Sequence, residues 1–162
     1  AVADHCPWQS IVSSPLSRCA AFAKELGQRH NLPVSFDERL MEIGFGEWEG
    51  RTKDDISAQA PQALQNFYND PIGFCPPGAE ALVDFEQRIT AAWQTLLQDY
   101  AGQHVLVVVH AGVIRMLVRH VLAAPLESMF RISVPNAGIS RFRVDAVGEQ
   151  ALTSLVFHDG QL

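Results

Sequence analysis

The segment HVLVVVHAGVIRMLVRHVL (residues 104–122) constrains the fold more than any other part of the chain. Residues 105–109 form an unbroken aliphatic run, without the polar alternation of a half-exposed strand. Such a run is typical of a strand that is covered on both faces, as in the parallel sheets of α/β proteins. The apolar residues after Gly112 recur at helical spacing, so we predict that a buried strand leads directly into a helix.

The remaining segments agree with an α/β architecture. The patterns predict a strand at 8–14, a short strand and a turn within 32–40, helices at 14–27 and 80–100, and a terminal hairpin at 139–145 and 150–158. Residues 41–56 predict a loop that leads into a polar helix. We therefore expect a single domain over residues 1–162. Its fold class is a three-layer α/β/α sandwich around a mostly parallel mixed sheet.

Composition argues against several classes of protein. The formal net charge of −6 is unlike the basic surface of a general nucleic-acid binder. No apolar run approaches the about 20 residues that cross a bilayer, and the chain shows no signal-peptide pattern. The three cysteines are scattered without CxxC spacing, which suggests free thiols. We expect a cytoplasmic protein without nucleic-acid or membrane partners.

Ligands of open α/β sheets bind beyond the carboxyl ends of the strands, so polar residues at predicted strand ends are candidate site residues. His110 ends the aliphatic run and precedes a helix N-terminus, where anions are favoured. Arg18 lies in the first helical turn after another strand, and a guanidinium binds a phosphoryl group through two parallel hydrogen bonds. Glu42 lies between apolar residues, where desolvation would raise its pKa and make it a usable acid.

Each candidate also has a purely structural alternative. His110 could bridge a buried turn, Arg18 could face solvent, and Glu42 could cap a turn or pair with Arg39 or Arg51. We find no metal-ligand spacing, P-loop or nucleophile elbow, and we expect no metal or organic cofactor. An arginine, an acid and a histidine together suit phosphoryl transfer, in which positioning and charge stabilisation dominate.

Four motifs, in the same order through nearly the whole chain, resemble the histidine phosphatase superfamily, the phosphoglycerate-mutase-like proteins. They are VSSPLSRCAAFA, LMEIGFGEWEG, PPGAEALVDFEQRI and VLVVVHAGVIRMLV. The resemblance implies that Arg18 binds phosphate and that Glu42 protonates the leaving oxygen. It implies that His110 contacts the phosphoryl group and stabilises its transition state. It also implies that the turn at Ala111 belongs to the phosphate pocket and that Glu80 helps to bind substrate.

One signature of the family is absent from these 162 residues. The resemblance implies a nucleophilic histidine in an Arg-His-Gly segment at the end of an interior first strand. We therefore expect that segment upstream of Ala1, or an equivalent strand from elsewhere, and we expect the chain alone to be inactive. Without such a strand, two neighbouring strands would have unpaired edges. In addition, Ala81 stands where the family pattern usually has serine.

Within the superfamily, FGEWEG and PPGAEALVDFEQR resemble the α-ribazole phosphatases of cobalamin synthesis, which remove a 5′-phosphate from a nucleotide-like riboside. The resemblance implies a phosphorylated small molecule as substrate. The alternatives within the superfamily are a broad-specificity sugar-phosphate phosphatase and a phosphoglycerate mutase relative. Two further alternatives are an inactive relative that binds phosphorylated ligands or a protein, and a nucleotide-binding domain in which His110 is structural. The oligomeric state stays open, with a homodimer as one alternative.

Overall fold

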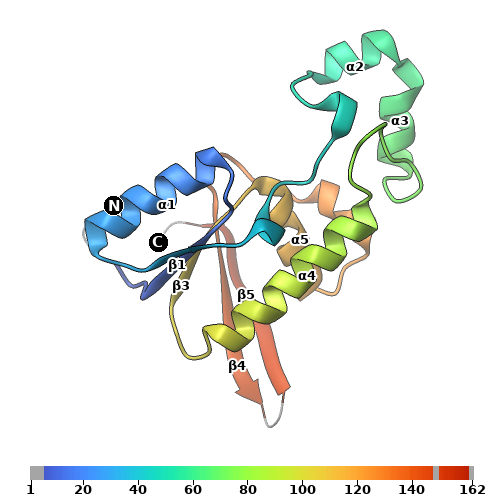
Figure 1. Cartoon of the computed structure of the whole chain (residues 1–162). Coiled ribbons are helices and arrows are strands. Elements are labelled where there is room, and N and C mark those ends of the chain that lie inside the picture. Colours follow the sequence, from blue (N-terminus) through green and yellow to red (C-terminus); the bar gives the residue numbers. More distant parts are fainter. Residues whose placement is uncertain (1–5, 148–149, 161–162) are drawn as a thin grey trace.

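Three parallel strands in the order β2–β1–β3 form the sheet that positions the site (Figure 1). They are β1 (Ser10–Ser13), β2 (Val34–Phe36) and β3 (Val105–Val108). The computed structural model describes residues 6–147 and 150–160. The β1–β2 register pairs Ile11 with Val34, Val12 with Ser35 and Ser13 with Phe36; the β1–β3 register runs from Ser10 with Val105 to Ser13 with Val108.

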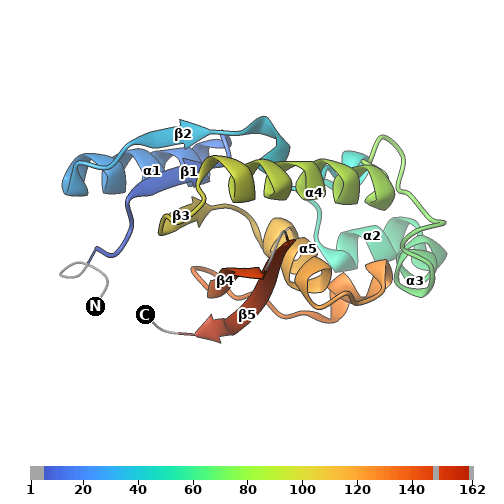
Figure 2. The same cartoon turned by 90° about the horizontal axis from the view of Figure 1, so that it is seen from below.

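Helices cover both faces of this sheet, as the three-layer prediction requires (Figure 2). Helix α1 (Ser17–His30) packs on the face that carries Ile11. Helices α4 (Leu82–Asp99) and α5 (Ala111–Val121) pack on the opposite face with Val12, because successive side chains of a strand point to opposite faces. None of the helices in the described part of the chain is long and apolar enough to cross a membrane.

The terminal hairpin forms a sheet of its own. Strands β4 (Ile139–Val147) and β5 (Gln150–Gly160) pair in antiparallel fashion with each other. The hairpin packs against α4 through the rings of Trp93 and Phe142, whose centroids are 5.6 Å apart. Within the described ranges, β3 pairs with β1 on one edge and with no strand on the other, and its residues are only half-buried. The expected mixed sheet is thus a parallel sheet beside a separate hairpin.

A small helical lobe stands away from the sheet (Figure 1). It contains α2 (Lys53–Gln59), which begins with a capping box, and α3 (Pro61–Asn69), which begins at a proline. Three short 3-10 helices connect the larger elements: η1 (Glu38–Leu40), η2 (Gly46–Trp48) and η3 (Leu126–Arg131). Buried Phe67 packs edge-to-face on Trp48 and holds α3 to the preceding loop. Residues 61–77 show only weak helical periodicity, so the sequence pattern alone does not predict α3.

Candidate active site

The predicted site residues come together at the carboxyl ends of β1 and β3. Ser14 directly follows β1, and Arg18 lies in the first turn of α1. His110 lies just beyond β3 and is the N-cap residue of α5. Glu42 reaches the same place from the loop after η1, and its side chain contacts the N-terminus of α5. The parallel pairing of β1 with β3 is what joins Arg18 to His110 across 92 positions of sequence.

The hydrogen bonds of the buried His110 ring define its tautomer. Arg18 Nε donates to Nδ1 of His110 over 3.1 Å, and Nε2 lies 2.8 Å from the Oγ of buried Ser14. Because a guanidinium can only donate, Nδ1 must present its lone pair. A neutral ring then carries its proton on Nε2, which donates to the Ser14 hydroxyl. The same hydroxyl accepts from the backbone N–H of Leu16, so the imidazole is held in one orientation.

His110 is neutral near neutral pH. The pKa of His110 is lowered from 6.5 to about 4, chiefly by burial of the ring and in smaller part by the charges of Arg18 and Arg88. Desolvation and nearby cations both disfavour the imidazolium form. The site therefore holds an uncharged histidine beside a permanently charged arginine, a combination that a bound anion would change.

The depressed pKa of His110 predicts a pH-dependent stability. Between pH 6.5 and about 4 the unfolded chain binds a proton at this residue that the folded chain does not. The free energy of unfolding should therefore fall as the pH drops through this window, by on the order of 3 kcal/mol from His110. Urea unfolding of the wild type and of His110→Gln between pH 4 and 7 measures this slope. The glutamine variant should lose this part of the slope and keep the part from His120, whose pKa burial also lowers. Parallel curves would show that His110 titrates normally.

The Glu42 carboxylate is held by backbone N–H groups. Oε1 accepts from the N–H of Ile43 and Oε2 from the N–H of Gly112, each over 3.1 Å. The second contact places the carboxyl group at the first turn of α5, where N–H groups lack helical partners. A Cβ atom at position 112 would lie 2.2 Å from Oε1, so only glycine leaves room for this side chain.

Arg18 is exposed, which leaves its guanidinium accessible to a ligand, while its Nε bonds to His110. Cys19, the next residue, is buried with its Sγ 3.6 Å from Nε2 of His110. Burial raises the pKa of the Cys19 thiol, so the thiol is protonated and packs against the ring. From the sequence pattern alone, Cys19 is predicted to be a helix core residue and Ser14 a helix cap, and neither is predicted to contact His110. Their position after a strand end was the one signal for a role near the site.

Of the structural alternatives for Glu42, the cap is formed, because the carboxyl group accepts from the N–H of Gly112 in the first turn of α5, whereas the ion pairs are not. Asp37 binds Arg39, and Gln59 accepts from Arg51, so neither arginine is the partner of Glu42. The Glu80 carboxylate is engaged by Arg88, and the structure brings it to the Glu42 loop rather than into contact with Arg18 or His110.

Ala111 is the first residue of α5 and directly follows His110. No group of three or more metal-ligating side chains occurs among the residues that the structure describes.

The exposed Arg18, the oriented His110 and the carboxyl group of Glu42 thus lie together at the carboxyl end of a parallel sheet in an α/β protein. The sequence profile of the histidine phosphatase superfamily (branch 1) matches residues 1–155. The chain belongs to this superfamily.

Three comparisons illustrate the relationship. A bifunctional protein of Mycobacterium tuberculosis is 32% identical over 131 residues, which are 81% of this chain and 36% of the relative. The glucosyl-3-phosphoglycerate phosphatase of Mycolicibacterium vanbaalenii is 33% identical over 125 residues, 73% of this chain and 55% of the relative. The crystal structure of the α-ribazole phosphatase from Shigella flexneri superposes with a TM-score of 0.80 at 25% identity, covering 97% of this chain and 76% of that one. The chain thus spans 36% and 55% of the length of these two curated relatives.

Proposed function

We propose that the protein is a phosphomonoesterase that hydrolyses α-ribazole 5′-phosphate. The observation that carries the proposal is the convergence of Arg18, His110 and Glu42 at the carboxyl ends of β1 and β3. Arg18 is a bidentate phosphate ligand, His110 an imidazole held in one orientation, and Glu42 a carboxylic acid. Phosphoryl transfer requires groups of these kinds. Membership of the histidine phosphatase superfamily supports the reaction class, and the likeness to an α-ribazole phosphatase supports the substrate.

In the proposed reaction, the Arg18 guanidinium binds two phosphoryl oxygens, and the N–H of Ala111 adds a donor from the start of α5. The negative phosphoryl group raises the pKa of His110, because an opposite charge offsets the cost of burying the imidazolium. His110 then takes up a proton on Nδ1, which ends the hydrogen bond that Nδ1 accepts from Arg18, and the imidazolium stabilises the charge that develops on the equatorial oxygens. Binding of the substrate therefore converts His110 from the neutral imidazole of the free protein to the charged imidazolium.

By the family resemblance, the phosphoryl acceptor is the histidine of an Arg-His-Gly segment, which residues 1–162 do not contain. Its nitrogen forms a bond to phosphorus, the bond from phosphorus to the ester oxygen breaks, and Glu42 gives its proton to the leaving alkoxide. A water oxygen then forms a bond to phosphorus, the phosphorus–nitrogen bond breaks, and the proton of that water returns to Glu42. The products are the alcohol and inorganic phosphate.

The proposal predicts a substrate preference of the full-length protein. Phosphate release should be at least about tenfold more efficient, by kcat/KM, from α-ribazole 5′-phosphate than from glucosyl-3-phosphoglycerate, since a preference of this size needs only about 1.4 kcal/mol of differential binding. A steady-state assay with both esters measures this ratio. The reverse preference would assign the chain to the second substrate, for which a relative is also known. Failure to release phosphate from any ester, with phosphate still bound, would favour an inactive binding protein.

A further inference from the structure

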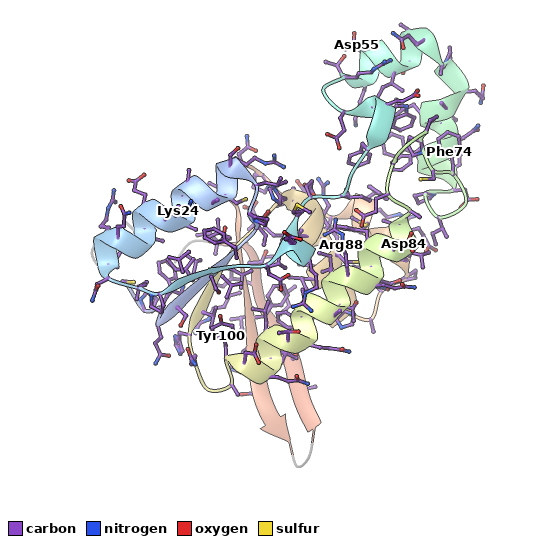
Figure 3. All side chains as sticks on the ribbon, viewed as in Figure 1. Lys24, Asp55, Phe74, Asp84, Arg88 and Tyr100 are labelled. Carbon is purple, nitrogen blue, oxygen red and sulfur yellow. The ribbon has the colours of Figure 1, made fainter. Side chains whose placement is uncertain are left out.

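Arg88 lies on α4 (Figure 3). Every hydrogen-bond donor of its guanidinium is used around the loop that carries Glu42. Nη1 donates to the carbonyl oxygens of Arg39 (2.6 Å) and Met41 (2.8 Å), and Nη2 donates to the carbonyl oxygen of Glu42 itself (3.1 Å). The two remaining donors reach the carboxylate of Glu80, from Nε over 2.6 Å and from Nη2 over 2.8 Å. A guanidinium has five N–H donors, and all five are occupied here.

Glu80 extends the same network to the other side of Glu42. Its Oε2 accepts from the backbone N–H of Gly44 over 3.4 Å, and the N–H of Glu80 donates to the carbonyl oxygen of Gly44 over 2.8 Å. The backbone is therefore tied to the Arg88–Glu80 pair before, at and after residue 42. A loop fixed at these points presents its side chain in one place.

We infer that Arg88, held by Glu80, is a positioning residue that aims the carboxyl group of Glu42 at the leaving oxygen of the substrate. This inference rests on the function proposed above. Two of the five Arg88 hydrogen bonds form the ion pair with Glu80. The other three go to backbone carbonyl oxygens of the loop that carries Glu42, and they are not part of the ion pair. The contacts leave the Glu42 side chain itself bound to Ile43 and Gly112, so Arg88 acts through the backbone.

A second ion pair on the same helix shows what a purely structural arginine does. Arg119 of α5 binds Glu86 of α4 and the carbonyl oxygen of Ala124, and so joins two helices at a distance from the Glu42 loop. Both arginines are largely buried and both bind a glutamate of similar exposure. The Arg119–Glu86 pair is therefore a matched control for loss of a buried ion pair without loss of the loop contacts.

The charge of Arg88 also lowers the pKa of His110, although burial of the ring and the charge of Arg18 have larger effects. Arg88→Lys keeps this charge while it replaces a planar fork of five donors with an ammonium group that has three. The substitution thus separates the geometry of the loop from the electrostatics of the site.

The dependence of the rate on the leaving group tests the inference. A positioned acid matters greatly for an alkyl ester, whose alkoxide must be protonated, and little for 4-nitrophenyl phosphate, whose phenolate leaves without help. In the full-length protein, Arg88→Lys should lower kcat/KM about 30-fold for glycerol 1-phosphate and no more than about threefold for 4-nitrophenyl phosphate. Glu80→Gln should also lower kcat/KM more for glycerol 1-phosphate than for 4-nitrophenyl phosphate, with smaller losses than Arg88→Lys. This variant provides the test if Arg88→Lys does not fold.

Two controls make the outcomes separable. Arg119→Lys should affect both esters equally and slightly, and Arg88→Lys should add little to the loss already caused by Glu42→Gln, because residues that act as one unit are not additive. Equal losses on both esters, or a full additional loss in the double variant, would overturn the inference while the proposed function stands. A wild-type protein that hydrolyses neither ester would instead overturn the proposed function.

Discussion

Arg18→Lys should lower kcat/KM of the full-length protein for every phosphate ester by at least about 10²-fold. The arginine is exposed at the start of α1, and its Nε donates to Nδ1 of His110. A lysine keeps the charge but presents a point donor that cannot bind two phosphoryl oxygens in one plane. It also removes the donor to Nδ1, so the His110 ring loses the contact that selects its tautomer. A steady-state assay with 4-nitrophenyl phosphate measures the loss independently of leaving-group protonation.

The same helix offers a matched control for Arg18. Arg29 lies in the last turn of α1 and pairs with Glu25 on the exposed surface. Exposed pairs of this kind contribute about 0.5 kcal/mol or less, so Arg29→Lys should leave both stability and kcat/KM nearly unchanged. If Arg18→Lys behaved like Arg29→Lys, Arg18 would be a solvent-facing helical residue, and our assignment of the phosphate ligand would be wrong.

Gly112→Ala should preserve the fold and remove the proposed acid from its place. The new methyl group would lie 2.2 Å from Oε1 and 3.1 Å from Cδ of Glu42, and the flexible end of that side chain is the part that can move. Alanine is also the better helix former by about 1 kcal/mol, so the start of α5 should not be weakened. We expect about 10²-fold lower kcat/KM for glycerol 1-phosphate, a much smaller loss for 4-nitrophenyl phosphate, and a melting temperature close to that of the wild type.

Gly44→Ala serves as the control for this substitution. Gly44 lies in the same loop as Glu42, but a Cβ atom there would come no closer than 3.9 Å to any neighbour. Its effect on either ester should be several-fold smaller than that of Gly112→Ala. Losses of equal size at the two glycines would point to general loop disturbance. An alanine at 112 without any effect would show that the observed position of Glu42 is not needed for turnover.

Much of the fold could be predicted from local pattern. The aliphatic run at β3, the amphipathic repeat of α4 and the alternation in the hairpin each follow from a periodicity contained in a few residues. Helix α3 was missed because its buried side is a single aromatic residue, Phe67, which packs on side chains of other segments. The apolar repeat of α3, formed by Ala63, Leu64 and Phe67, covers little more than one turn, which is too short to distinguish a helix from a loop by pattern.

The candidate site divides in the same way. The residue types at strand ends, together with the family motifs, were enough to select Arg18, Glu42 and His110. The pattern could not indicate that Ser14 orients His110, because the two residues are 96 positions apart. Nor could it indicate that Arg88 binds the Glu42 loop, since the three carbonyl oxygens it contacts lie 46 to 49 positions away.

The sequence by itself thus determined which elements form and which functional groups lie at their ends, since those depend on side-chain periodicity and on neighbours along the chain. Only the tertiary structure decided the tautomer of His110, the hydrogen bond from the N–H of Gly112 to the Glu42 carboxyl group, and the use of all five donors of Arg88. These features are distances between atoms of different elements. They exist only after the parallel pairing of β1 and β3 and the packing of α4 and α5 against the sheet have brought those elements together.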